Sequence, residues 1–227
     1  MLVKFLKQSW LVMVAALGFG LLVAAVNGSL EKRIEKNAKD KLNREMGILF
    51  KEHKNCLFEE VAVKDKRGKN VIYSIKDEPG KAVTYHVIYT VENTESKTDK
   101  QLTSKAIVGY AIEAIGGGFA DKIRLLVAVD VDLKTLLGYA VLKSNETPGF
   151  GDKIDNEEFK NQFIGCPAAK LKVEIQGDRS VLDETIVAIT GATVSSEAVT
   201  KIVNKALKKI KEIDRSRKSK VMEAVPD

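Results

Sequence analysis

The chain has 227 residues, 44% of them hydrophobic and 30% charged, which fits one main folded domain with an appendage. This composition excludes disordered, collagen-like and disulfide-framework proteins. The formal net charge of +6 is concentrated between Lys201 and Lys220, where nine basic residues accompany two acidic ones. Because no aromatic residue interrupts that run, we expect a solvated helix face that contacts anionic lipid or an acidic partner protein, and no nucleic acid.

The N-terminal segment is apolar. No charged residue occurs from Gln8 to Leu30, and a bilayer is crossed by about 20 apolar residues. Lys4 and Lys7 precede this segment, and Trp10 suits a membrane interface. A cleaved signal peptide has a similar start, but its apolar region is only about 7–15 residues long. We therefore expect residues 1–30 to be an uncleaved membrane anchor.

Two sequence signals disagree about the side of the membrane on which the domain lies. The basic residues between Lys32 and Arg44 favour a cytoplasmic domain by the positive-inside rule. The signal-like start favours the opposite side, and a whole domain can be exported despite flanking charge. We predict a single-pass protein of the inner (cytoplasmic) membrane, with residues 31–215 on the extracytoplasmic, periplasmic side and a polar C-terminal tail over 216–227.

After the anchor, helical composition extends over 30–58 and is followed by strand-forming residues. We expect a hairpin of strands at 71–75 and 84–91 with a turn at 77–80, and then a loop over 92–105. Further strands are predicted at 106–114, 123–131 and 137–143, with short connections at 116–118 and 132–135.

Such short connections indicate antiparallel strands. A helix at 157–163, short strands at 170–175 and 186–189, and a final helix with an apolar stripe over 198–213 complete the pattern. The expected fold is therefore α+β: a curved, mostly antiparallel sheet with flanking helices, preceded by one transmembrane helix.

Several standard sites are absent from the sequence. It has no GxGxxG after a strand, no phosphate-loop GxxxxGK, no GxSxG and no HExxH. His53 and Cys56 supply too few ligands for a structural metal site, and Asp130 with Asp132 fits turn chemistry. Cys56 and Cys166 are the only cysteines; they form either one disulfide or, as we slightly favour because nothing in the sequence indicates that the sulfurs approach each other, two buried free thiols.

The segment Thr190-Gly191-Ala192-Thr193-Val194-Ser195-Ser196 lies between a short strand and the last helix. One interpretation is that its hydroxyl residues cap the helix and that Gly191 lets the chain turn. The other is an anion site, because the free backbone N–H groups and the dipole of a helix N-terminus attract phosphate, and Ser195 and Ser196 could add donors.

The segment from Asn145 to Asp152 follows a predicted strand and contains one Pro and two Gly. It fits a plain turn. It also fits one wall of a site for a planar aromatic cofactor, because a short rigid loop exposes backbone amides beside Thr147 and Phe150.

Together, Glu146-Thr147-Pro148-Gly149-Phe150-Gly151 and Thr190-Gly191-Ala192-Thr193 resemble the ETPGLG and S/TGAT motifs of a known family. That family is the FMN-binding domain shared by the G subunit of the Rnf ion-translocating electron-transport complex and the C subunit of the sodium-pumping NADH:quinone reductase. The resemblance covers about residues 105–210, and the compact length is more similar to the Rnf protein.

The resemblance implies that FMN is attached to Thr193 through a phosphoester bond made by a separate flavin transferase. Thr190, Gly191, Ala192, Ser195 and Ser196 would surround the phosphate. The isoalloxazine ring would lie against Glu146, Thr147, Gly149 and Phe150, with the turn at 116–118 nearby. Two positions depart from the family: Val187 stands where its motif has aspartate, and Phe150 replaces a leucine.

The implied function is that of a flavoprotein subunit of a membrane translocase of the ferredoxin:NAD oxidoreductase type, which relays electrons through FMN to its neighbouring subunits. Such a relay requires no catalytic acid or base and no metal. Two alternatives remain: the C subunit of the sodium-pumping quinone reductase, and a membrane-anchored binding or assembly protein without flavin.

Overall fold

The computed structural model describes the backbone of residues 2–51, 56–60, 63–64, 70–71, 85–94 and 102–223, and the side chains of 10–31, 33–51 and 107–215. The chain divides into two compact units, Met1–Lys41 and Leu42–Asp227. The turn predicted at 77–80, the metal-capable pair His53 and Cys56, and the side chains of the tail beyond residue 215 lie outside these described residues.

The first unit consists of most of helix α1 (Leu2–Leu49). From Trp10 onward this helix is long and apolar enough to cross a membrane by length and composition. Its large apolar side chains between Trp10 and Leu30 are exposed, as those of a lipid-facing helix would be. The N-terminal apolar helix expected from the sequence is thus present, and its length and composition would allow it to cross a membrane.

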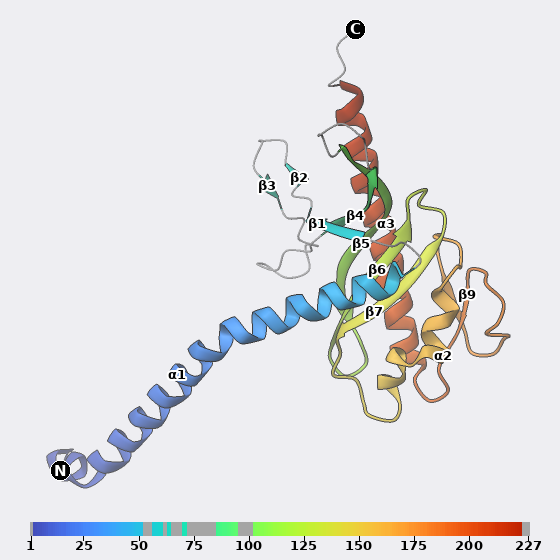
Figure 1. Cartoon of the computed structure of the whole chain (residues 1–227). Coiled ribbons are helices and arrows are strands. Elements are labelled where there is room, and N and C mark those ends of the chain that lie inside the picture. The colour runs from blue at the N-terminus through green and yellow to red at the C-terminus, as the bar shows by residue number, and fades with distance from the viewer. Residues whose placement is uncertain are drawn as a thin grey trace. The chain divides into compact units, whose positions relative to one another are not determined.

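The second unit is built on a five-stranded antiparallel sheet of order β1-β4-β5-β6-β7 (Figure 1). The strands are β1 (Cys56–Glu60), β4 (Tyr85–Thr94), β5 (Leu102–Gly117), β6 (Lys122–Asp130) and β7 (Leu136–Lys143). Two short strands, β2 (Val63–Lys64) and β3 (Asn70–Val71), pair separately. The predicted strands at 84–91, 106–114, 123–131 and 137–143 are confirmed, and so are the antiparallel connections at 116–118 and 132–135. The strand at 84–91 pairs with β1 and β5, and not in the predicted hairpin with 71–75. The helix expected over 30–58 ends at Leu49, and residues 56–60 form β1.

The prediction of a loop over 92–105 was wrong at both ends. Glu92 pairs with Ser104, and the ladder between β4 and β5 continues to Thr94 and Leu102. The residues there are polar, but a hairpin satisfies the backbone hydrogen bonds whatever the side chains are, and strand propensity depends strongly on context. The predicted strand at 71–75 is described only at Val71, in β3.

The segment after β7 contains short elements. They are the 3₁₀ helix η1 (Gly151–Asp155), α2 (Glu157–Lys160), the 3₁₀ turn η2 (Asn161–Phe163), β8 (Lys172–Glu174) and β9 (Thr185–Val187). The helix predicted at 157–163 is therefore confirmed with a tightened last turn. Strands β8 and β9 are shorter than predicted, and they pair in parallel.

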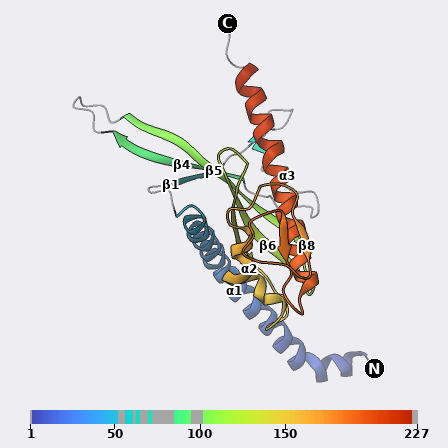
Figure 2. The ribbon, with the colours of Figure 1, turned by 90° about the vertical axis from the view of Figure 1, so that its right-hand side faces the viewer.

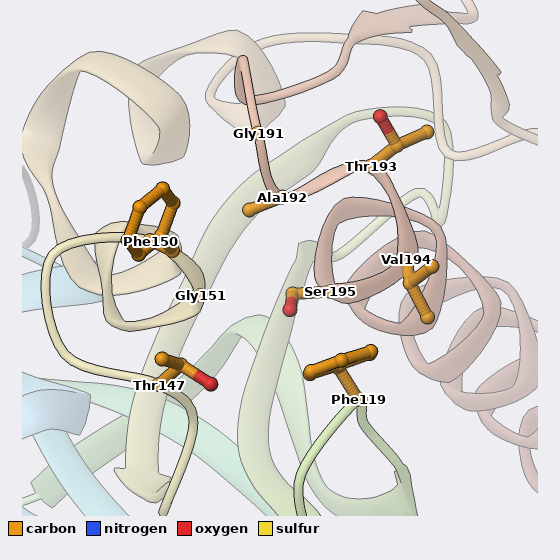
Figure 3. A pocket seen from close by; sticks show the side chains of 9 residues that line it. All are labelled: Phe119, Thr147, Phe150, Gly151, Gly191, Ala192, Thr193, Val194 and Ser195. Atoms are coloured by element: carbon orange, nitrogen blue, oxygen red, sulfur yellow. The ribbon is translucent and has the colours of Figure 1, made fainter.

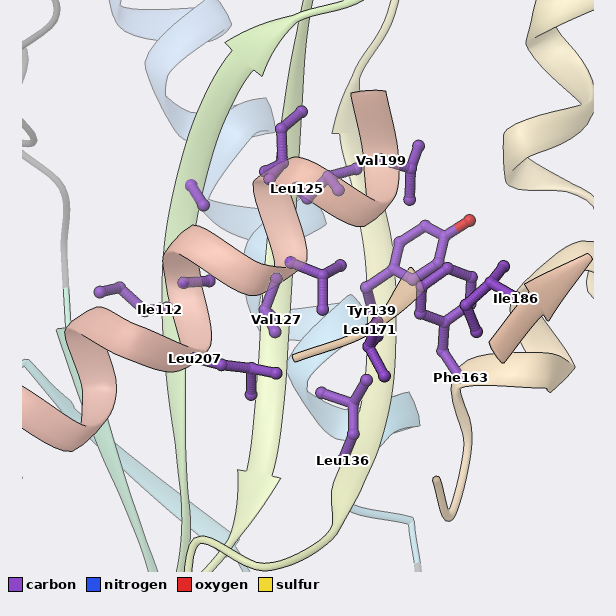
Figure 4. Close-up of a cluster of buried hydrophobic side chains, with 14 of the residues drawn as sticks. Ile112, Leu125, Val127, Leu136, Tyr139, Phe163, Leu171, Ile186, Val199 and Leu207 are labelled. Carbon is purple, nitrogen blue, oxygen red and sulfur yellow. The ribbon is translucent and has the colours of Figure 1, made fainter. Parts of the chain in front are cut away.

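The last helix, α3 (Thr193–Glu223), packs along one face of the sheet against β5 and β6 (Figures 1 and 2). Its predicted apolar stripe is buried and joins side chains of β5, β6, β7 and the short elements in the main core (Figure 4). Gly116 makes close packing possible, because a Cβ there would overlap Ile202. This packing fixes where α3 begins, and its first turn forms part of the site.

The opposite face of the sheet is covered by the end of α1. Met46 and Phe50 are buried in a smaller core against Ala111, Leu126 and Ala128. The sheet is therefore packed on both faces, and the α+β fold expected from the sequence is confirmed.

Two minor predictions concern polar groups. Oδ1 of Asp130 accepts hydrogen bonds from the backbone N–H groups of Lys134 and Thr135, which confirms its turn role. Cys166 is a buried free thiol, and burial raises its pKa to about 11. The side chain of Cys56 lies outside the described residues.

Candidate functional site

The loop after β7 is a tight turn. Pro148 fixes its own φ angle, and Gly149 follows with a φ of +78°. The N–H of Phe150 donates to the carbonyl of Thr147 at 3.2 Å, and the N–H of Asp152 donates to the same carbonyl at 3.3 Å. Proline followed by glycine with positive φ is the pattern of a type II turn. The turn holds Phe150 with its side chain 55% exposed.

The second loop enters α3 through Gly191, whose φ is +79°. Ala192 is the N-cap, because its carbonyl accepts the N–H of Ser196, the first bond of the helix. Alanine has no side-chain acceptor for the orphan amides of the helix start. Among the described residues, no hydrogen bond uses the backbone N–H of Thr193, Val194 or Ser195. The start of α3 therefore offers three donors and the positive end of the helix dipole to an anion.

The hydroxyls of this second loop have different partners. Oγ of Ser196 donates to the carbonyl of Ala192 and accepts the N–H of Ile189, both at about 3 Å, so it closes the turn from within. Thr193 is half-buried, and its hydroxyl makes no hydrogen bond among the described residues. The Ser196 hydroxyl thus fixes the turn before α3 without capping an amide of the helix start, and the hydroxyl of Thr193 remains available.

The structure brings the two loops together, although they are about 40 residues apart in sequence. A Cβ at Gly191 would lie 3.3 Å from the ring of Phe150, so the two turns touch there. Between them is a pocket of about 410 Å³, within the range of small-molecule sites. It is lined by Phe119, Thr147, Phe150, Gly151, Gly191, Ala192, Thr193, Val194 and Ser195 (Figure 3).

We call four side chains the rim of the pocket: Phe119, Phe150, Thr193 and Val194. The rim is apolar apart from the hydroxyl of Thr193. Phe119 is 67% exposed and Val194 is 53% exposed. The two phenylalanines come from different loops and lie on different sides of the pocket (Figure 3). Exposed aromatic side chains that border a pocket are suited to a planar aromatic ligand.

Behind the pocket lies a polar junction that we call the floor: the side chains of Glu146 and Ser195 with the backbone N–H groups of 119–121. Its two side chains are buried, whereas residues 119–121 are exposed. Glu146 is 6% exposed and Ser195 is 2% exposed. The Glu146 carboxylate accepts the N–H groups of Phe119 at 3.2 Å, Ala120 at 3.0 Å and Asp121 at 3.5 Å. It also accepts the hydroxyl of Ser195. One buried carboxylate thus connects three segments of the chain.

The charge of this carboxylate is stabilised by its donors. Burial by itself would raise the pKa of Glu146, but the hydrogen bonds from Ser195, Ala120, Phe119 and Asp121 outweigh that effect. The pKa therefore lies below the ordinary value for glutamate. At neutral pH Glu146 is an ionised acceptor with no proton to donate.

The strand before the second loop is also held by a side chain. Val187, at the position where the family motif has aspartate, is buried. Its N–H donates to the amide oxygen of Gln162 at 2.8 Å, and its carbonyl accepts the amide nitrogen of Gln162 at 3.2 Å. The segment leading to Thr193 is thus fixed through its backbone, and the side chain at 187 belongs to the core.

Of the ten predicted site residues, the structure places six on the pocket: Thr147, Phe150, Gly191, Ala192, Thr193 and Ser195. Glu146 and Ser196 lie behind the pocket with their side chains bonded to protein groups, while Gly149 and Thr190 are exposed outside its lining. The roles of all ten residues toward a cofactor stay predictions.

Sequence reasoning missed Phe119, Gly151 and Val194. Phe119 directly follows the glycine run 116–118, which the sequence had indicated as a weaker part of the site. An aromatic residue next to a glycine turn was the signal that could have found it. Among the residues that the structure describes, no three His, Cys, Asp or Glu side chains are grouped to hold a metal ion.

Comparison with known proteins agrees with this geometry. Residues 118–208 match the FMN-binding domain family. The chain is 35% identical over 105 residues to the G subunit of the ion-translocating oxidoreductase complex of Methanosarcina acetivorans, covering 46% of this chain and 53% of that protein. It is also 35% identical over 103 residues to the G subunit of the proton-translocating ferredoxin:NAD(+) oxidoreductase complex of Clostridium ljungdahlii, covering 45% and 54%.

The matched region spans about half the length of these curated relatives. Among solved structures, the chain is similar to the C subunit of the Na⁺-translocating NADH-quinone reductase of Parabacteroides distasonis, with a TM-score of 0.44 and 20% identity, covering 68% of this chain and 74% of that one. The matched family region, 118–208, contains Phe119, Phe150 and Thr193. Residues 118–208 thus match the FMN-binding domain family, and the chain is similar over about 105 residues to the G subunits of ion-translocating oxidoreductase complexes.

Proposed function

We propose that this protein is the flavoprotein subunit of a membrane-bound ion-translocating electron-transport complex of the ferredoxin:NAD oxidoreductase type, and that its FMN is bound covalently to Thr193. The observation that carries the proposal is the position of the Thr193 hydroxyl. It lies on the rim of the pocket, in the first turn of α3, beside three backbone N–H groups without partners among the described residues.

The phosphate end of FMN fits this helix start. The amides of Thr193, Val194 and Ser195 would donate to phosphate oxygens, and the helix dipole would favour the negative charge. The turn is already closed by Ser196 and by the N-cap carbonyl of Ala192, so phosphate binding requires no rearrangement.

The ring end of FMN fits the rim. Phe119 and Phe150 would contact the isoalloxazine faces or edges, and Thr147 would supply a nearby hydroxyl. When bound, FMN supplies the electron-transfer chemistry. The chain positions the ring, excludes water from part of it and holds the phosphate, and none of these roles requires a catalytic acid or base.

Attachment to Thr193 needs an activated donor. A phosphoester forms from an alcohol when the phosphoryl group carries a leaving group, so the donor would be a flavin phosphoanhydride delivered by a flavin transferase. The bond from Oγ to phosphorus would form as the anhydride bond breaks, the other phosphate of the anhydride would depart as the leaving group, and the hydroxyl proton would pass to the transferase or to solvent. Thr193 suits this step because its hydroxyl has no other hydrogen bond among the described residues.

The partners follow from the anchor and the charge. We propose that α1 holds the protein in the inner membrane, with the FMN-binding domain on the extracytoplasmic side. Other membrane subunits of the complex would donate and accept the electrons. The exposed lysines of α3, including Lys201 and Lys208, are suited to an acidic partner surface or anionic lipid.

The experiment is expression of the full chain with a flavin transferase, followed by denaturing electrophoresis and detection of flavin fluorescence. Wild type should give a fluorescent band, and Thr193→Val should give none. Ser180→Ala is the control, because it removes an exposed hydroxyl that lies outside both motifs and outside the pocket lining. It should keep the fluorescence.

Mass spectrometry of the peptide from Ile186 to Lys201 should show one added FMN group in wild type. Fluorescence that persists in Thr193→Val would contradict attachment at this residue. A wild-type chain without any flavin would instead support a membrane-anchored binding or assembly protein, in which the pocket has another ligand.

A further inference from the structure

The floor of the pocket is a polar junction whose centre is Glu146. This carboxylate accepts three backbone N–H groups from the turn between β5 and β6, and one hydroxyl from the first turn of α3. Glu146 itself follows β7. It therefore joins the β5–β6 turn, the loop after β7 and the start of α3, and these segments carry Phe119, Phe150 and Thr193.

The surroundings of Glu146 leave no room for a further group. A Cβ at Gly118 would overlap the Glu146 carboxylate and lie 2.7 Å from the carbonyl of Asp121. A Cβ at Gly151 would lie 2.9 Å from Glu146 Oε2 and 2.8 Å from Ser195 Oγ. Two glycines thus permit the close approach of backbone on both sides of the carboxylate.

Glu146 does not line the pocket, although Phe119 does. The backbone N–H of Phe119 is bound directly by Glu146 Oε2. The N–H of Ala120, the next residue, is bound by Oε1. The two carboxylate oxygens therefore fix two successive peptide groups, and this sets the direction in which the Phe119 side chain leaves the turn.

We infer that Glu146 is a positioning residue: it does not touch the flavin ring, and it fixes the Phe119 side of the pocket relative to Phe150 and the helix start at Thr193. The role toward flavin rests on the proposed function. The junction itself is a property of the protein without flavin. Ser195 takes part at both ends, because its hydroxyl binds Glu146 while its backbone N–H is one of the three proposed phosphate donors.

An exposed bond between the same segments provides a matched control. Nδ2 of Asn145 donates to Oδ2 of Asp121 at 2.7 Å, on the surface beside the buried junction. A solvated bond contributes little, because water replaces either partner. Asn145→Ala therefore removes a connection between the same two loops without affecting the floor.

The first test is amide hydrogen exchange, followed by mass spectrometry, on the full chain in detergent and without flavin. Glu146→Gln should speed exchange in peptides that contain 119–121 by about tenfold, because the amides lose a charged acceptor. Ser195→Ala, a smaller change that keeps the fold, should speed it to a lesser extent. Asn145→Ala should stay within about twofold of wild type.

The second test separates positioning from direct contact by a double-mutant cycle on reversible FMN binding. The background is Thr193→Val, which cannot form the ester. Glu146→Gln and Phe119→Ala should each weaken FMN binding by about tenfold. The double variant should bind FMN no more weakly than the weaker-binding single variant, because both changes remove the same contact, that of the Phe119 side chain with the flavin.

Two outcomes would overturn the inference. One is wild-type exchange at 119–121 in Glu146→Gln together with weakened FMN binding, which would mean that Glu146 contacts the flavin. The other is a double variant whose loss of FMN affinity is the product of the losses in Glu146→Gln and Phe119→Ala, which would mean that the two residues act independently. If the Thr193→Val chain binds no FMN at all, the proposed function is in question, while the exchange result still decides whether Glu146 holds the Phe119 wall.

Discussion

The floor and the rim of the pocket are formed by the same loops but differ in how their polar groups are satisfied. On the floor, the Glu146 carboxylate and the Ser195 hydroxyl are buried and bonded to each other and to backbone. On the rim, the Thr193 hydroxyl and the first amides of α3 have no partner among the described residues, and the phenylalanines are largely exposed. The difference indicates that the floor stabilises the protein, while the rim is completed by a ligand.

The largest effect on stability is expected from removing the floor carboxylate. Glu146→Ala would leave three backbone N–H groups and one hydroxyl without their charged acceptor, which should cost about 3 kcal/mol. Denaturant unfolding of the full chain in detergent, followed by circular dichroism, measures this loss. Thr193→Val on the rim should change stability by less than about 0.5 kcal/mol. Equal losses in the two variants would remove the distinction between floor and rim.

A smaller loss is expected from crowding the floor. Gly118→Ala places a methyl group against the Glu146 carboxylate and should cost about 2 kcal/mol, the usual range for overpacking. Gly117→Ala is the matched control, because a Cβ at the neighbouring residue meets nothing within 4 Å. Thermal melts of both variants measure the contrast. A Gly118→Ala chain as stable as Gly117→Ala would mean that the junction tolerates displacement.

On the rim, the effect should appear in binding and not in stability. Phe150→Ala removes an exposed ring next to the pocket and should weaken reversible FMN binding by about tenfold, as expected for a lost aromatic contact. Its melting temperature should stay near that of wild type. Fluorescence titration with FMN in the Thr193→Val background measures the affinity. An unchanged affinity would mean that the flavin ring does not contact Phe150.

The smallest effect is the pH dependence of the floor. Because the pKa of Glu146 is lower in the folded than in the unfolded protein, its ionised form stabilises the fold. This contribution is fully present above the ordinary glutamate pKa of about 4.3 and is lost as the pH falls through the lower folded value. Asp121, whose pKa is lowered chiefly by Asn145, acts in the same direction. Melting temperatures between pH 7 and pH 3 should fall less in Glu146→Gln than in wild type.

The two motif loops could be found from the sequence because each contains residues with a local conformational role. Pro148 and Gly149 form a turn by their own φ preferences, and Gly191 takes up positive φ before an apolar helical repeat. The strands at 123–131 and 137–143 were equally readable from their β-branched and apolar residues. By contrast, the polar stretch 92–105 gave no strand signal, since cross-strand pairing alone makes its ends part of the sheet.

The partners of the site side chains required the tertiary structure. Nothing local to Ser195 or Glu146 indicates that they bond to each other across 49 positions, and the two sequence-based expectations were that one served the phosphate and the other the ring. Phe119 was missed for the same reason, because its place on the rim depends on where the β5–β6 turn meets α3.

The sequence by itself determined the apolar N-terminal helix, the strand and helix types around the site, and the two loops that carry the resemblance to FMN-binding domains. These features depend on residues close in sequence, through hydropathy, φ preference and periodicity. Only the tertiary structure decided which hydroxyl is available and which is used within the protein. The availability of a hydroxyl depends on which groups are buried together on folding, because buried polar groups form hydrogen bonds with one another.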